Sequence, residues 1–160
     1  MATDIKAKRF TDGTAAAATT IAAAQTLGGA GNMTLAGTAA TFGGTNLGQK
    51  ITLVSTGNIS AVTFTITGTD PTGASQTEDL TGPNNSTVTS TKYFNTVTQI
   101  AASGAVGTNT SSGVAADQGG TLFAGRTRVR GMHAVNAGAG TIFFNNSSID
   151  GSEILGVPVD

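Results

Sequence analysis

The chain of 160 residues contains no cysteine, no tryptophan and a single tyrosine, Tyr93. Without cysteine, neither disulfide bonds nor thiolate metal sites can form. Charge is also scarce, because 11% of the residues are Asp, Glu, Lys or Arg, against roughly 25% in ordinary soluble domains. The net charge of −1 provides no basic footprint for nucleic acid. We therefore expect no nucleic-acid partner.

Long apolar segments are missing as well. A membrane-spanning helix would need a run of about 18 apolar residues, and the sequence has no such run. The first residues, Met1–Lys6, lack the basic and then apolar pattern of a secretory signal. We expect no membrane partner and synthesis in the cytoplasm. If the protein ends outside the cell, we expect it to leave by a route other than secretion, such as assembly into a particle.

Thr, Ser and Asn take the place of Lys and Glu as the solvated residues, and glycine is abundant, with 23 copies. A chain that is 38% hydrophobic is too apolar for a disordered tail. This composition is typical of β-rich structural or extracellular modules, whose surfaces often rest on neighbouring copies. One domain of this length can bury a sufficient core without covalent staples.

The clearest local pattern is the alternation of Val62, Phe64 and Ile66 with threonines at positions 63, 65 and 67. Side chains of a strand point to opposite faces with a period of two, so this segment predicts a strand with one apolar and one hydroxylated face. A turn follows at Asp70–Gly73, where Pro presets φ and Gly accepts a positive φ. The polar run Ser75–Leu80 is then expected to return beside it as an edge strand.

Similar short strands, separated by Gly, Asn and Pro turns, recur along the chain, and no β–α alternation is present. This spacing predicts an all-β fold, an antiparallel β-sandwich or barrel-like domain. We expect that domain to span residues 32–160, after an extended N-terminal arm, residues 1–31. Within the arm, the Ala-rich run Thr14–Gln25 is interrupted by β-branched residues and is expected to be extended or weakly helical. The last strand, Ser152–Val157, is expected to stop at Pro158.

Catalytic patterns are absent. General acid–base or nucleophilic chemistry needs a base beside a nucleophile or a matched pair of carboxylates. The only histidine is His133, and the adjacent Glu78 and Asp79 would point to opposite faces of a strand. We expect no enzymatic activity and no cofactor. Whether a cation binds near Asn145–Glu153 stays open, since that loop is rich in oxygen ligands but does not match the EF-hand spacing.

Two clusters of basic residues are candidate contact sites. Arg126, Arg128 and Arg130 alternate on a predicted strand, which places three guanidinium groups on one face, where they repel one another unless paired. This face is solvated or contacts carboxylates of a neighbouring chain, where the guanidinium fork provides geometric specificity. Binding of nucleic acid or of a phosphorylated glycan is the remaining alternative. Lys6, Lys8 and Arg9 lie in the N-terminal arm, which is either solvated or docks on a partner.

Several segments together resemble small virion structural proteins of tailed bacteriophages. A Gly-Thr-Asp turn, a Glu-x-x-x-Gly-Pro segment and a Tyr-Phe-x-x-Val-x-x-Ile segment follow one another in that group as they do here. The resemblance covers roughly residues 32–145 and rests on these segments: Ile51–Asn58, Val62–Asp70, Thr77–Glu78, Thr81–Pro83, Tyr93–Ile100 and Ala134–Phe144. These positions are strands and turns, so the resemblance implies a fold and a setting but no functional residue.

The resemblance implies a sandwich-like subunit of a phage particle, most simply a capsid decoration or cement protein. Its expected partners are the major capsid protein and neighbouring copies of itself, as a homo-oligomer in the virion. A tail, adaptor or fibre component is the first alternative. A carbohydrate-binding or adhesin module is the second, although such modules usually present aromatic platforms and this chain has one Tyr and no Trp.

Overall fold

The computed structural model describes the backbone of residues 8–121, 140–145 and 153–159, and the side chains of residues 8–121. The chain divides into two compact units, Met1–Gly120 and Thr121–Asp160. This division differs from the predicted one, which separated residues 1–31 from a single domain over residues 32–160. Each unit is described by itself below.

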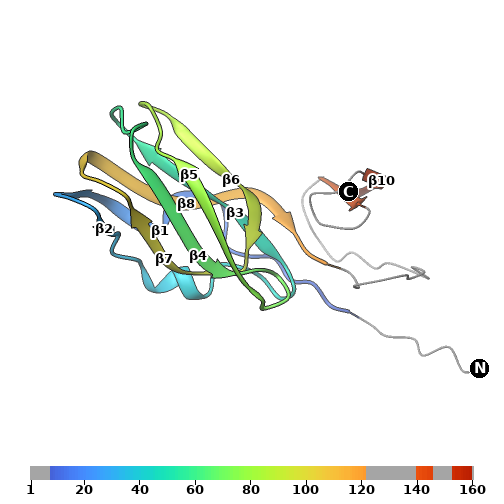
Figure 1. The fold of residues 1–160 in the computed structure, drawn as a ribbon. Helices are drawn as coiled ribbons and strands as arrows, with labels where there is room; N and C mark the ends of the chain where they lie inside the picture. Colours follow the sequence, from blue (N-terminus) through green and yellow to red (C-terminus); the bar gives the residue numbers. More distant parts are fainter. Residues whose placement is uncertain (1–7, 122–139, 146–152, 160) are drawn as a thin grey trace, which may run out of the picture. The chain divides into compact units, whose positions relative to one another are not determined.

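The first unit is a β-sandwich (Figure 1). One sheet has the strand order β1-β8-β3-β6 and the other β2-β7-β4-β5, and the strand pairs are antiparallel. The prediction of an all-β sandwich is confirmed. The elements are β1 (Ala17–Leu27), β2 (Gly31–Asn32), the 3-10 helix η1 (Gly37–Ala40), β3 (Gly48–Ser55), β4 (Thr63–Thr69), β5 (Ser75–Thr81), β6 (Thr87–Phe94), β7 (Thr96–Ala102) and β8 (Val106–Gly119).

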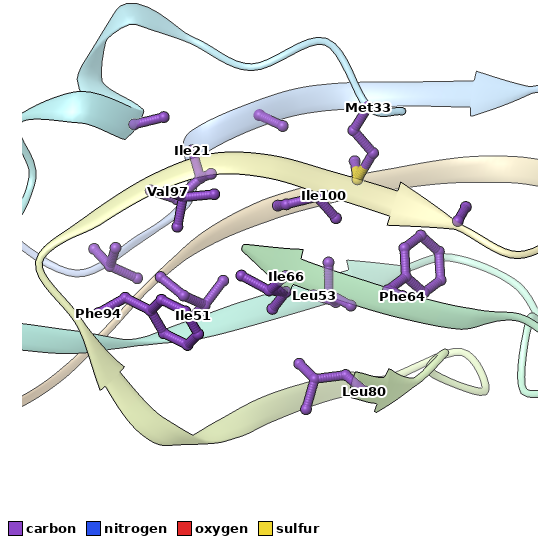
Figure 2. Packing of buried hydrophobic residues seen from close by; sticks show 14 of the residues in the cluster. Ile21, Met33, Ile51, Leu53, Phe64, Ile66, Leu80, Phe94, Val97 and Ile100 are labelled. Carbon is purple, nitrogen blue, oxygen red and sulfur yellow. The ribbon is translucent and has the colours of Figure 1, made fainter. Parts of the chain in front are cut away.

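The core lies between the two sheets and is built from alternate residues of their strands (Figure 2). Ile51 and Leu53 of β3 face it from one sheet, and Phe64 and Ile66 of β4 face it from the other, and all four are fully buried. On β4 the intervening threonines are exposed or half-buried. The alternation in the sequence therefore predicts which face of β4 is buried.

The predicted hairpin and its turn are present as β4 and β5. Phe64 pairs with Leu80 and Thr69 with Ser75, while Gly73 has a φ of +87°. The Asp70 carboxylate accepts hydrogen bonds from the Thr72 N–H (2.7 Å), the Thr72 hydroxyl (2.7 Å) and the Ala74 N–H (2.9 Å). Partial burial by itself would raise the pKa of Asp70. The hydrogen bonds from the turn outweigh that effect and lower the pKa below its usual value.

The predicted N-terminal arm is in large part a strand of the sandwich. β1 pairs with β8, and Ile21 and Ala22 are fully buried. The Ala-rich run is extended rather than helical, because its β-branched residues suit a strand and its partner strand satisfies the backbone. The prediction of an extended arm over residues 1–31 is therefore wrong for Ala17–Leu27, which form β1.

The second unit contains a two-stranded antiparallel hairpin of β9 (Gly140–Asn145) and β10 (Glu153–Val159). The expectation that the last strand stops at Pro158 is wrong, because Pro158 pairs with Thr141 and the strand continues to Val159. Proline lacks an N–H, so it is found in strands mainly where its nitrogen faces an edge. The predicted strand Arg126–Arg130 lies outside the described residues.

Candidate interaction surfaces

The outer face of the β2-β7-β4-β5 sheet is dominated by hydroxyl groups. The strand registers bring alternate residues of β4, β5 and β7 to this face. We call it the hydroxyl face and define it by Thr63, Thr65, Thr67, Thr69, Ser75, Thr77, Asp79, Thr81, Thr96 and Gln99. Asp79 is the only ionisable residue in this set.

Cross-strand hydrogen bonds fix several side chains of the hydroxyl face. The Thr65 hydroxyl donates to the Asp79 carboxylate at 2.6 Å, and the hydroxyls of Thr69 and Thr96 lie 2.7 Å apart. Such pairs reduce the freedom of side chains that would otherwise rotate at the surface. The face thus presents methyl and hydroxyl groups in a regular array with one carboxylate, which is suited to packing against another uncharged surface.

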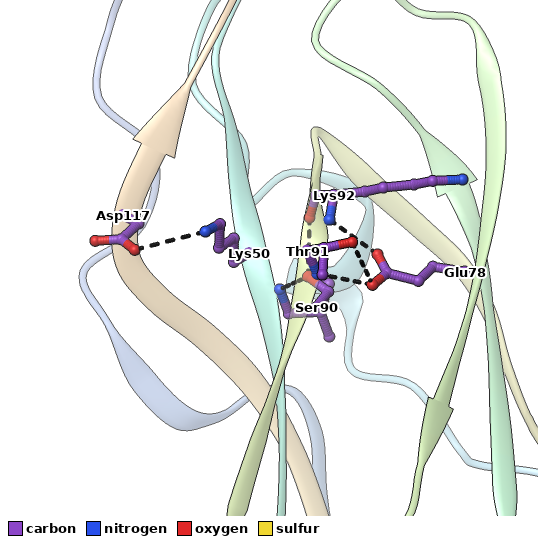
Figure 3. Close-up of polar contacts among 7 residues, drawn as sticks. Lys50, Glu78, Ser90, Thr91, Lys92 and Asp117 are labelled. Atoms are coloured by element: carbon purple, nitrogen blue, oxygen red, sulfur yellow. Dashed lines mark hydrogen bonds and ion pairs between the residues drawn. The ribbon is translucent and has the colours of Figure 1, made fainter. Parts of the chain in front are cut away.

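A second polar feature joins the two sheets along one side of the sandwich, where the edge strands β5 and β6 lie side by side (Figure 3). The Glu78 carboxylate accepts hydrogen bonds from the Thr91 N–H (2.7 Å), the Thr91 hydroxyl (2.9 Å) and the Lys92 N–H (2.9 Å). Gln76 donates to the Tyr93 carbonyl at 2.6 Å. These contacts satisfy backbone groups of β6 that an open edge would leave to water or to another chain.

We expect Glu78→Ala to lower the free energy of unfolding by about 1–2 kcal/mol, since three hydrogen bonds to a half-buried carboxylate are lost. The neighbouring Asp79→Ala is the matched control. Asp79 is exposed and accepts the single Thr65 hydrogen bond, so its loss should cost less than about 0.5 kcal/mol. Urea unfolding followed by circular dichroism measures both. Equal losses for the two variants would contradict the role assigned to Glu78.

The N-terminal segment is held against the sandwich from Arg9 onward. The Thr14 N–H donates to the Phe42 carbonyl at 2.7 Å, and the side-chain amide of Asn46 donates to the Arg9 carbonyl at 2.8 Å. The fully buried Gln49 donates to the carbonyls of Thr14 (2.8 Å) and Ala115 (3.2 Å). One amide group therefore joins the N-terminal segment to β8.

The structure places the predicted basic residues as follows. Arg9 has an exposed side chain, and the Lys8 ammonium lies 5.6 Å from the centre of the Phe10 ring. The Phe10 ring lies against Gly120, so the chain enters and leaves the sandwich at one end. Lys6, Arg126, Arg128 and Arg130 lie outside the described residues. Their grouping as contact sites therefore stays a prediction.

The other candidate sites fall largely outside the described part of the chain. This applies to His133, Asn146 and Asp150, whereas Asn145 pairs with Glu153 in the β9–β10 register. Among the residues that the structure describes, no group of three or more His, Asp or Glu residues is placed to hold a metal ion.

Sequence reasoning missed the contacts of Gln49, Gln76 and Glu78. A signal for the last two exists in the sequence, because Gln76, Glu78 and Leu80 alternate along β5 and share one face. Inward polar residues beside a buried Leu indicate an edge strand with a polar partner. No comparable signal identifies Gln49, whose partners lie 35 and 66 residues away in the chain.

No helix within residues 8–121, 140–145 or 153–159 is long and apolar enough to cross a membrane. Comparisons with protein-family models, curated proteins and solved structures found no match to this chain.

Proposed function

We propose that this chain is a non-enzymatic structural protein of a tailed-phage virion, which decorates the assembled head and stabilises it. The observation that supports the proposal best is the hydroxyl face, whose defining residues include a single ionisable one, Asp79. Such a face loses little solvation free energy when it is covered, since burying a charge costs far more than burying a hydrogen-bonded hydroxyl.

A decoration protein binds a shell at many equivalent places, and many weak contacts together stabilise the particle. A rigid block suits that task, because little conformational entropy is lost when it docks. The sandwich meets this need, with a core closed by its own strands and two of its edge strands joined by Gln76 and Glu78. The partners in this proposal are the major capsid protein and neighbouring copies of the chain, with no cofactor.

The proposal is tested on purified particles of the phage that encodes the chain. We expect the protein to be present in hundreds of copies, measured by quantitative mass spectrometry against the major capsid protein, and gold-labelled antibody to bind the head. A few to dozens of copies, with label on the tail, would instead make it a tail, adaptor or fibre component. Absence from particles would refute a virion role.

A comparison of variants then tests the hydroxyl face itself. Thr67→Lys places a charge on this face, opposite Thr77, whereas Thr52→Lys places one on the other sheet, in β3. We expect Thr67→Lys to weaken binding to particles that lack the protein by at least about tenfold, and Thr52→Lys to have little effect. Equal binding by the two variants would contradict the assignment of the hydroxyl face as the docking surface.

A test of the N-terminal arm needs a deletion that is shorter than the predicted arm, residues 1–31. Removing residues 1–31 would also remove β1, including the buried Ile21 and Ala22, and would disturb the sandwich. Removing residues 1–7, which include Lys6, leaves every described contact in place. Comparing particle binding by that shortened chain with binding by the full chain therefore tests the arm alone.

A further inference from the structure

β1 is an edge strand, since among the described strands it pairs with β8 alone. It is 11 residues long and contains no charged residue and no proline. An exposed strand edge offers unpaired N–H and C=O groups to another chain, and proteins usually protect it with charged residues, proline, bulges or a covering segment. β1 lacks the first two of these devices. Its exposed positions include four alanines: Ala17, Ala18, Ala23 and Ala24.

A covering segment is present along β1. It consists of residues Thr34–Thr38, which lead from β2 into η1, and we call it the strap. The Ala36 N–H donates to the Ile21 carbonyl at 2.8 Å, and the Thr38 hydroxyl donates to the Thr20 carbonyl. These carbonyls of an edge strand are therefore occupied from within the same chain.

Gln25 fastens the beginning of the strap to β1. Its side-chain amide donates to the Thr34 carbonyl at 3.0 Å, and its Oε1 accepts the Thr34 N–H at 2.8 Å. Both backbone groups of Thr34 thus pair with one side chain, as they would with a residue of a neighbouring strand. The same amide also donates to the Ala23 carbonyl at 3.2 Å. Gln25 therefore joins the strap to β1 and occupies a further carbonyl of β1 itself.

The strap is anchored near its ends but held to β1 by contacts that are open to water. Met33 precedes it and Ala39 follows it, and both are buried, while Leu35 packs half-buried against the core. Hydrogen bonds between exposed groups add little net stability, because water competes for each partner. Local opening of the strap therefore requires little more than the loss of these bonds. The other residues of the strap are exposed: Thr34, Ala36, Gly37 and Thr38.

We propose that the strap prevents the outer edge of β1 from pairing with β1 of a second copy of this chain, and that Gln25 is its principal fastening. A second copy is the partner that the sequence of β1 fits, because two uncharged, alanine-rich strands can approach each other without repulsion and with little steric hindrance. Antiparallel pairing about a two-fold axis brings the same backbone groups of both copies together. With the strap closed, those groups are already occupied.

Sedimentation velocity of the full-length chain over a range of micromolar concentrations tests this proposal. Gln25→Ala removes three hydrogen bonds, which should raise the population of chains with an open edge, and the association constant with it, by at least about tenfold. Gln99→Ala is the matched control, since Gln99 is exposed in the other sheet and donates to the Asn32 side chain at 2.9 Å. It should associate no more than the unsubstituted chain. Equal association of the two variants would overturn the proposal.

A second substitution identifies the surface through which the Gln25→Ala chain associates. Ala23→Lys, added to Gln25→Ala, should return the association constant to that of the unsubstituted chain, because a lysine on an edge strand opposes pairing with another copy. Thr89→Lys is the matched control, at an exposed position of β6 on the other edge of the same sheet, and should have no such effect. If the two lysines act alike, the association uses another surface and the proposal is wrong.

Thr38→Val covers the case in which Gln25→Ala does not fold. It removes the hydroxyl that donates to the Thr20 carbonyl and keeps the size of the side chain, so it should also increase association, by a smaller factor. Hydrogen exchange adds a local readout in the folded variants. Exchange of the Ala36 amide, which donates to Ile21, should accelerate more than that of the Met33 amide, which donates to Ile100. Equal acceleration of the two amides would contradict a local opening of the strap.

The role of the strap does not depend on the proposed virion role. Absence of the protein from particles would refute only the virion role. Equal association of Gln25→Ala and Gln99→Ala would refute only the role of the strap.

Discussion

Phe64→Ala should lower the free energy of unfolding of the sandwich by about 3–5 kcal/mol. Phe64 is fully buried near the start of β4, where it pairs with Leu80 of β5 and Ala102 of β7, and it is among the largest fully buried side chains of the described residues. The loss combines the transfer free energy of the ring with the cavity left behind, because the paired neighbouring strands can close it only in part. A loss of this size approaches the whole stability of a typical domain.

The matched control is Thr63→Ala, one residue away on the hydroxyl face. Its side chain is exposed, and its N–H hydrogen bond to the Ser103 hydroxyl involves the backbone and survives the change. We expect a loss below about 1 kcal/mol, in the range of β-propensity differences. Urea unfolding followed by circular dichroism gives both values. Similar losses would mean that the two faces of β4 are assigned incorrectly.

Gly113→Ala is expected to have the next largest effect, a loss of about 2–3 kcal/mol. A Cβ on Gly113 would lie 1.8 Å from the Ala17 carbonyl oxygen and 2.6 Å from the Ala18 carbonyl carbon. Both are backbone atoms of β1, so no flexible side chain can move aside. The added methyl group must therefore separate β1 from β8, which breaks part of their pairing.

Gly107→Ala is the control for this change, in the same strand. A Cβ there meets nothing within 4 Å, and the residue has no positive φ. The free energy of unfolding should change by less than about 1 kcal/mol, and we expect it to rise, since alanine restricts the unfolded chain more than glycine does. Hydrogen exchange adds a local readout. Relative to the unsubstituted chain, Gly113→Ala should increase the exchange rates of the β1 amides more than those of the β4 and β7 amides. An equal increase in all strands would contradict the stated cause.

The β4–β5 hairpin was predictable in detail because its determinants are local. Alternation of apolar residues with threonine defines the faces of β4, and Asp70, Pro71 and Gly73 define the turn. Each signal acts within a few residues, where strand geometry and turn chemistry leave few options.

The role of β1 was not predictable in this way. Its Ala-rich sequence has no strict alternation, so local propensity favoured neither an integrated strand nor a helix. Its place in the sheet depends on β8, some 90 residues later in the chain, where Gly113 permits the close approach of Ala17. Complementarity of this kind between distant segments leaves no local pattern in the sequence.

The sequence by itself determined the fold class, the buried face of β4 and the scarcity of charged groups, since composition and a period of two are enough to define these. Tertiary structure alone decided that residues 17–27 belong to the sandwich, that Glu78 joins β5 to β6, and that β10 pairs with β9 through Pro158. The physical reason is that a strand satisfies its backbone hydrogen bonds only with another strand. Which strand that is depends on packing among residues far apart in the chain.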